Sequence, residues 1–203
     1  MLNYKEFSFI FNEFATENKT KLNELDGAQG DGDLGMTILY TSQALLKSAD
    51  SSDNLQQWLE VGGKTVRREA PSTMGILLAS SLIAVSKTLN EGQTSLSPNE
   101  WVQVQQTMIN EIKKRGGAQL GDKTLLDAFI PAVETFSISI NNGDSIEEAI
   151  KNASQAAKHA ADKTAELTSK IGRSSWIQER SQGNIDGGAW ACYKVYELLA
   201  KSI

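Results

Sequence analysis

Between two segments with helical periodicity the chain reads Leu25-Asp26-Gly27-Ala28-Gln29-Gly30-Asp31-Gly32-Asp33-Leu34-Gly35-Met36-Thr37. Glycine permits positive φ angles and sharp reversals, so the three carboxylates of this Asp/Gly loop can converge on one point. Converging carboxylates repel one another unless a cation lies among them, and hard oxygen ligands of this kind suit magnesium or calcium. The helix that begins near Met36 would direct its N–H groups at an anion there. The loop therefore predicts a metal-bridged phosphate site, with a solvated Asp/Gly turn as the alternative.

The composition is that of an ordinary globular chain. It has 203 residues, 40% hydrophobic and 22% charged, which fits one domain over residues 1–203. A net charge of −5, without a basic stripe, argues against nucleic acid as a partner. One cysteine, Cys192, excludes an internal disulfide and favours a reducing, cytoplasmic location. Neither a secretory signal nor a membrane-spanning segment is expected.

Apolar residues recur at helical spacing along almost the whole chain, which predicts an all-α fold. Ser72 and Ser145 are expected to cap helices, and Ser97-Pro98-Asn99-Glu100 is typical of a helix start. The segment 74–89 is apolar nearly all round, which predicts a central, heavily buried helix. Phe136, Ile138 and Ile140 alternate as in a strand, but we favour a frayed helix end. The expected helices cover about 4–25, 36–47, 54–69, 74–89, 98–115, 125–140, 145–167 and 189–200.

Short connections between these eight helices predict an antiparallel up-and-down bundle or barrel. The loops after the first, third, fifth and seventh helices then lie at the same end. These loops are 26–37, 70–75, 116–124 and 172–188, and three of them are polar and rich in glycine. The topology thus predicts one composite site at one end of the bundle.

With these loops in view, the chain resembles the DhaL subunit of dihydroxyacetone kinase, from about residue 3 to residue 200. The resemblance rests on Leu25-Asp26 with Gly30-Asp31-Gly32-Asp33-x-Gly35, on Lys114-Arg115-Gly116 with Gly121-Asp122-Lys123-Thr124, and on Gly172-Arg173-Ser174-Ser175 with Glu179-Arg180-Ser181 and Asp186-x-Gly188. Each motif is weak by itself. Their common order and spacing make the resemblance specific.

The resemblance implies an eight-helix α-barrel with ADP or ATP at one end and two magnesium ions that bridge the phosphates. It implies that Asp26, Asp31 and Asp33 bind the metals. It also implies nucleotide contacts in four places. These contacts fall on Leu34, Gly35, Met36 and Thr37, on Thr73 and Met74, on Gly116 and Leu125 beside the adenine, and on Arg173, Asp186, Gly187 and Gly188. Arg173 is the candidate catalytic residue.

On this resemblance the chain is the nucleotide-binding part of a kinase for dihydroxyacetone or a related ketose, an enzyme of glycerol metabolism. It would need a DhaK-like partner subunit, whose histidine holds the ketone. A DhaM-like subunit of the phosphotransferase system would rephosphorylate bound ADP. The ketose, the phosphate donor and the oligomeric state, a homodimer included, stay open.

Three positions depart from the family pattern. Leu34 stands where the family has histidine, and Ala70-Pro71-Ser72-Thr73-Met74-Gly75 replaces a turn with two more glycines. Gly183-Asn184-Ile185-Asp186-Gly187-Gly188 replaces a turn with histidine and proline. Fewer glycines leave less room for backbone near a phosphate. The departures motivate an alternative, a non-catalytic or regulatory DhaL paralogue that binds a DhaK-like or regulatory protein; a module of an acyl kinase is a third, weaker option.

Several other residues have an ordinary structural interpretation. Asp122 is expected to cap the sixth helix, with Lys123 directed to solvent. His159 is expected to be a solvated helix residue, and Cys192 a buried packing residue. Arg173 and Arg180 are either nucleotide contacts or charges on a solvated loop. The four tryptophans are interpreted as packing residues.

Overall fold

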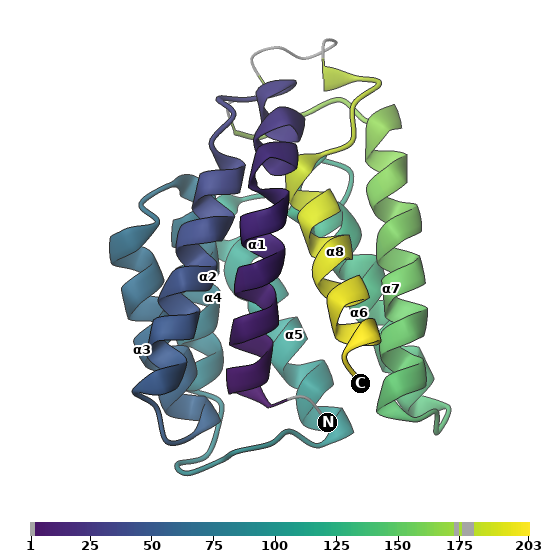
Figure 1. Ribbon diagram of the computed structural model, residues 1–203. Helices are drawn as coiled ribbons and strands as arrows, with labels where there is room; N and C mark the ends of the chain where they lie inside the picture. Colours follow the sequence, from purple (N-terminus) through teal and green to yellow (C-terminus); the bar gives the residue numbers. More distant parts are fainter. Residues whose placement is uncertain (1–2, 173–174, 176–180) are drawn as a thin grey trace. The chain divides into compact units, whose positions relative to one another are not determined.

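The computed structural model describes residues 3–172, 175 and 181–203. In this part of the chain there are eight α-helices, one short 3-10 helix and no strand (Figure 1). The all-α class and the number of helices were predicted correctly. The bounds are α1 Tyr4–Gly27, α2 Leu34–Asp50, α3 Leu55–Glu69, α4 Thr73–Ser86, α5 Pro98–Gly116, α6 Leu125–Asn141, α7 Ile146–Lys163, η1 Thr164–Glu166 and α8 Gly187–Lys201.

The chain forms two compact units. The first unit is Met1–Lys19 with Gly35–Gly116, and the second unit is Thr20–Leu34 with Gly117–Ile203. Helix α1 contributes its first part to the first unit and its last part to the second. The prediction of a single domain over 1–203 stays a prediction.

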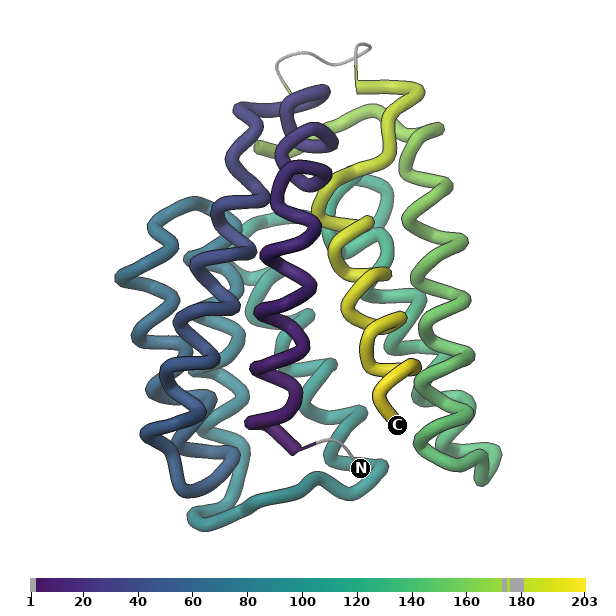
Figure 2. The backbone as a smooth tube through the Cα atoms, in the orientation of Figure 1, coloured from purple at the N-terminus to yellow at the C-terminus, as the bar shows by residue number. Residues whose placement is uncertain are grey.

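Close helix packing organises the first unit. Trp58 on α3 is buried, donates its indole N–H to the carbonyl of Leu45 at 3.1 Å, and lies 5.5 Å from the ring of Tyr4. Gly63 lets α3 approach α4, because a Cβ at this position would lie 2.9 Å from the carbonyl oxygen of Ala79. Consecutive helices of the unit run in alternating directions along the trace (Figure 2).

The expected caps of the first unit are present, and the heavy burial predicted for α4 holds for only part of the helix. Ser72 accepts a hydrogen bond from the N–H of Gly75 at 3.0 Å and begins α4. Ser97 and Glu100 exchange hydrogen bonds at the start of α5. Helix α4 is not enclosed on all sides, because Ile76 is 44% exposed.

In the second unit, helices α6, α7 and α8 alternate in direction and pack together (Figure 1). Helix α7 presents small buried residues at Ala149, Ala153, Ala157 and Ala161, which lets its neighbours approach closely. Phe136 is 1% exposed and lies inside α6, which continues to Asn141. The alternating apolar residues therefore belong to a helix rather than to a strand, as we favoured, but the helix is regular here and not frayed.

Candidate functional site

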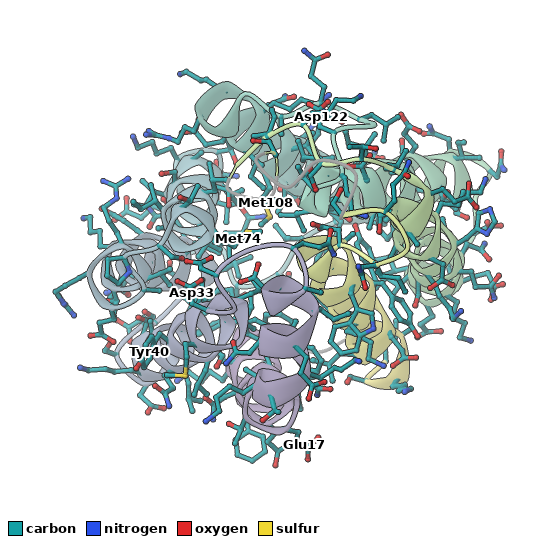
Figure 3. The ribbon with its side chains drawn as sticks, turned by 90° about the horizontal axis from the view of Figure 1, so that it is seen from above. Glu17, Asp33, Tyr40, Met74, Met108 and Asp122 are labelled. Atoms are coloured by element: carbon teal, nitrogen blue, oxygen red, sulfur yellow. The ribbon has the colours of Figure 1, made fainter. Side chains whose placement is uncertain are left out.

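The three aspartates of the Asp/Gly loop gather at one point of the second unit. Asp26 lies in the last turn of α1, and Asp31 and Asp33 follow in the loop before α2; Figure 3 labels Asp33. One carboxylate oxygen from each lies within 4.8 Å of the others. Asp26 is half-buried, whereas Asp31 and Asp33 are exposed. The predicted convergence of the three carboxylates is thus present in the structure.

Asp26 organises this loop through both its side chain and its backbone. Its Oδ2 accepts hydrogen bonds from the N–H groups of Asp33 at 3.0 Å and Leu34 at 3.3 Å. Its carbonyl oxygen accepts from Gln29 at 2.9 Å and Gly30 at 2.5 Å. A Cβ at Gly30 would lie 3.0 Å from Asp26 Oδ1, so glycine leaves the space beside this second oxygen open. Oxygen donors beside an open space are what a magnesium ion requires, so the residues fit this metal.

The last loop of the second unit lies against the Asp/Gly loop. Gln29 is 5% exposed and donates Nε2 to the carbonyl of Ile185 at 2.8 Å. Its Oε1 has no hydrogen-bond partner among the described residues. A Cβ at Gly187 would lie 2.8 Å from Leu34 Cδ2 and 3.6 Å from the nitrogen of Asp26, so a larger residue here would require the Leu34 side chain to shift.

Asp186 begins α8 and carries a perturbed carboxyl group. Its side chain accepts a hydrogen bond from the N–H of Ala189 at 2.7 Å. Burial is the main cause that raises the pKa of Asp186 to about 7; the charges of Asp127 and Asp26 raise it further, whereas the Ala189 hydrogen bond and the charge of Lys123 lower it. A shift of this kind is common in functional sites.

Lys123 is buried in the second unit and joins two of its loops. It is 1% exposed, and its Nζ donates to the carbonyl oxygens of Thr164 at 2.9 Å, Leu167 at 3.2 Å, Ser181 at 2.6 Å and Asn184 at 2.7 Å. Burial lowers the pKa of Lys123, and the charge of Asp186 raises it. We predicted Lys123 in solvent, and this was wrong. No sequence signal marks the burial, because a lysine is almost never fully buried unless it is paired.

The predicted cap of α6 was also wrong. Thr124 caps the helix and forms a reciprocal pair with Asp127, which accepts from the Thr124 N–H at 2.7 Å. Asp122, labelled in Figure 3, accepts instead from the N–H of Gln119 at 2.8 Å and lies 3.6 Å from Lys170 Nζ.

In the first unit, the starts of α2 and α4 are joined. Thr37 Oγ1 and Ser72 Oγ are 2.8 Å apart and share a hydrogen bond. Thr73 is exposed and Met74 is half-buried in the first turn of α4, where Figure 3 labels Met74. Gly75 is required there, because a Cβ would lie 1.9 Å from the carbonyl oxygen of Ala70.

The predicted site residues are divided between the units. The first unit holds Gly35, Met36, Thr37, Thr73, Met74 and Gly116; the second holds Asp26, Asp31, Asp33, Leu34, Leu125, Asp186, Gly187 and Gly188. Arg173, like Ser174, Trp176, Glu179 and Arg180, lies outside the described residues.

Two of the residues given an ordinary interpretation, His159 and Cys192, behave as expected. His159 is exposed on α7. Cys192 is a buried free thiol, and burial raises its pKa above the ordinary value. Neither residue contributes to the site.

A family model described as the DAK2 domain matches residues 28–201. The chain belongs to the DAK2 domain family. Within this family it is 31% identical, over 95% of its length, to the "PTS-dependent dihydroxyacetone kinase, ADP-binding subunit DhaL" of Lactococcus lactis, 93% of which is covered. It is 28% identical to the corresponding "PEP-dependent" subunit of Escherichia coli, with 92% of this chain and 89% of that protein covered. The resemblance to DhaL inferred from the motifs is confirmed.

Other proteins that match the chain are much longer. The chain is 30% identical to a "Probable dihydroxyacetone kinase" of Dictyostelium discoideum, and the match covers 92% of this chain but 30% of that protein. A crystal structure of the dihydroxyacetone kinase from C. freundii in complex with AMP-PNP and Mg2+ matches with a TM-score of 0.78 at 24% identity, covering 98% of this chain and 33% of that one. At this identity the likeness shows a shared fold. The chain thus spans about a third of these larger enzymes. None of its described helices has the length and apolar character needed to cross a membrane.

Proposed function

We propose that this DAK2 protein is the ADP- or ATP-binding, magnesium-dependent subunit of a ketose kinase, with residues 1–203 acting as one nucleotide-binding domain. The observation that carries the proposal is the convergence of Asp26, Asp31 and Asp33 in a loop whose glycines leave one side open. The names of the relatives support the same reaction, because they include dihydroxyacetone and erythrulose kinases.

The three aspartates would hold the metal, with two magnesium ions as the proposed number. Bound magnesium neutralises phosphate charge and orients the transferred group. Asp26 Oδ2 is occupied by two N–H groups, so Oδ1 is the oxygen that remains for a ligand. Asp31 and Asp33 are exposed, which leaves their oxygens accessible to a hydrated ion.

The remaining candidates would bind the nucleotide. In the first unit we assign phosphate contacts to Gly35, Met36, Thr37, Thr73 and Met74 and an adenine contact to Gly116. Backbone N–H groups of a first helical turn suit phosphate oxygens. In the second unit we assign contacts to Leu34, Leu125, Asp186, Gly187 and Gly188. Arg173 is proposed to stabilise the transferred charge.

The proposed assembly includes a substrate subunit. A DhaK-like partner would present the ketose, and a DhaM-like phosphotransferase protein would recharge bound ADP. The names of two relatives, which include "PTS-dependent" and "PEP-dependent", support this donor. The assembly, including a homodimer of this chain, is testable by mixing purified components.

A calorimetric titration tests the proposal. ADP with magnesium should bind the wild-type protein, and binding should weaken strongly in Asp31→Asn. Lys151→Met, an exposed change on α7, is the matched control and should bind normally. Absence of binding by the wild type, or an Asp31→Asn variant that binds as tightly as wild type, would refute the nucleotide site. Phosphoryl transfer to dihydroxyacetone with a DhaK-like subunit then tests the reaction.

One observation favours a second function, that of a regulatory DhaL paralogue. Leu34 is 6% exposed, and its N–H donates to Asp26. Its buried apolar side chain offers no polar group at the position where the family has histidine. On this alternative the protein binds a DhaK-like or regulatory protein but does not support turnover. Phosphoryl transfer in the reconstituted mixture would exclude it, and Leu34→His would raise the rate if the leucine is what limits turnover.

A further inference from the structure

The side chain of Lys123 has an unusual environment. Its ammonium group is surrounded by four backbone carbonyl oxygens, at 2.6 to 3.2 Å from Nζ. These oxygens come from two stretches of the long connection between α7 and α8, Thr164 to Leu167 and Ser181 to Asn184. A cation placed among carbonyl dipoles brings together the short helix η1 with its C-cap and the loop that precedes α8.

The backbone at Lys123 is strained in order to reach this position. Its φ of 62° is the one positive φ of a non-glycine residue within the described residues. A residue other than glycine, asparagine or aspartate rarely adopts this conformation. Burial of an ammonium is also unfavourable unless its N–H groups are all bonded. Both unfavourable features persist because the carbonyl contacts compensate for them.

Hydrogen bonds of neighbouring residues connect the carbonyl groups around Lys123 to the Asp/Gly loop. Asn184, which accepts from Lys123, precedes Ile185, which accepts from Gln29 at 2.8 Å. Thr164, another acceptor for Lys123, accepts at its hydroxyl from the N–H of Asp186 at 2.8 Å. The segment 184–186 is therefore held from both sides. Gly187 directly follows it, and a Cβ added there would lie 3.6 Å from the backbone nitrogen of Asp26, so this glycine lies close to the Asp/Gly loop.

We propose that Lys123 is a positioning residue for the metal and nucleotide site: its ammonium serves as an internal cation that holds the 164–167 and 181–184 carbonyls together and so fixes residues 185–187 against the loop that carries Asp26. The inference rests on the proposed function and adds a residue that does not touch the ligand. Removal of the ammonium releases the 181–186 segment, while the helices keep their own packing.

Two substitutions distinguish the effect of the ammonium group from the effect of the backbone conformation at position 123. Lys123→Met keeps most of the side-chain volume but has no N–H donor. Lys123→Gly relieves the positive φ and removes the side chain altogether. Loss of groups that orient metal ligands typically weakens metal binding by about 10- to 100-fold, and this loss is expected for both variants in a titration with magnesium and ADP. Lys151→Met, an exposed lysine on α7, should bind as wild type does.

Hydrogen exchange distinguishes a positioning role of Lys123 from a general contribution to the stability of the second unit. In Lys123→Met the amides of residues 184–189 should exchange faster, whereas those of Ala153 and Ala157, which are buried in α7, should keep their protection. Equal loss of protection throughout α6, α7 and α8 would overturn the proposal, because Lys123 would then be an ordinary core residue. Binding by Lys123→Met at wild-type affinity would overturn it as well.

Chemical rescue keeps the test decisive if Lys123→Met does not fold. In Lys123→Gly, n-butylammonium has the length and the N–H donors of the lost side chain, whereas tetramethylammonium has the charge but no donor. Restoration of magnesium-ADP binding by n-butylammonium alone supports the proposal, and no restoration by it overturns the proposal. Failure of the wild-type protein to bind magnesium and ADP would refute the proposed function instead.

Discussion

The Asp33→Asn variant should be more stable than wild type without magnesium and less stable than wild type with it. Asp33 directly precedes α2, a position where asparagine is as suitable as aspartate, so the change removes charge with little effect on the helix start. The carboxylate oxygens of the cluster lie within 4.8 Å of one another, and Asp31 and Asp33 are exposed. The substitution therefore removes charge at the cluster and at the start of α2 while it keeps a polar side chain of the same size.

The expected magnitude follows from this geometry. At 4.8 Å, the upper limit of these separations, each of the two pairs that Asp33 forms repels by about 0.9 kcal/mol in water. The favourable interaction of Asp33 with the start of α2, about 0.3–1 kcal/mol, is lost as well. The net gain in the free energy of unfolding is then about 1 kcal/mol at low salt. For a chain of this size this corresponds to about 2–4 °C in melting temperature.

Magnesium should reverse the order of stability, so that wild type becomes more stable than Asp33→Asn. At a free concentration about 100 times its Kd, a ligand that binds only the folded state stabilises it by about 2.7 kcal/mol. Wild type should gain this amount, and Asp33→Asn should gain much less because one ligand is missing. Urea unfolding at low ionic strength, with a chelator and then with magnesium, measures both effects. A variant that is less stable in chelator, or that gains as much from magnesium as wild type, would contradict the assignment of the cluster.

Three further predictions concern the framework around the site. Gly75→Ala should destabilise the first unit by about 3 kcal/mol or more in urea unfolding, because the new Cβ would lie 1.9 Å from the carbonyl oxygen of Ala70; normal stability would show that the turn relaxes. Phe136→Ala, at a side chain 1% exposed, should destabilise by about 3–5 kcal/mol. Ile138→Ala, 60% exposed on the same helix, should have little effect and serves as its control. The pKa of Glu197 is lowered to about 2, mainly by a lysine hydrogen bond, so this carboxylate contributes stability above its unfolded pKa and loses it as the pH falls. Acid unfolding of Glu197→Gln should therefore lack the loss of stability between about pH 4.5 and 2 that wild type shows, and identical profiles would exclude the contribution.

The helices and their starts were predictable because local chemistry determines them. Apolar spacing of 3.6 residues identified all eight helices, and Ser72 and Ser145 cap α4 and α7 as expected. The composition of the Asp/Gly loop also predicted that its carboxylates meet. Each of these features depends on residues that are neighbours in the sequence.

Burial in the second unit was decided by the tertiary structure alone. Lys123 bonds to carbonyl groups 41 to 61 residues away, and Gln29 bonds to one 156 residues away. A lysine beside a helix start has the same local pattern whether it faces solvent or a cluster of carbonyls. Only the folded connection between α7 and α8 supplies those acceptors, and without them burial of the ammonium would be too unfavourable. The sequence by itself thus determined the helices and the carboxylate loop, while tertiary contacts decided which side chains hold the last loop against it.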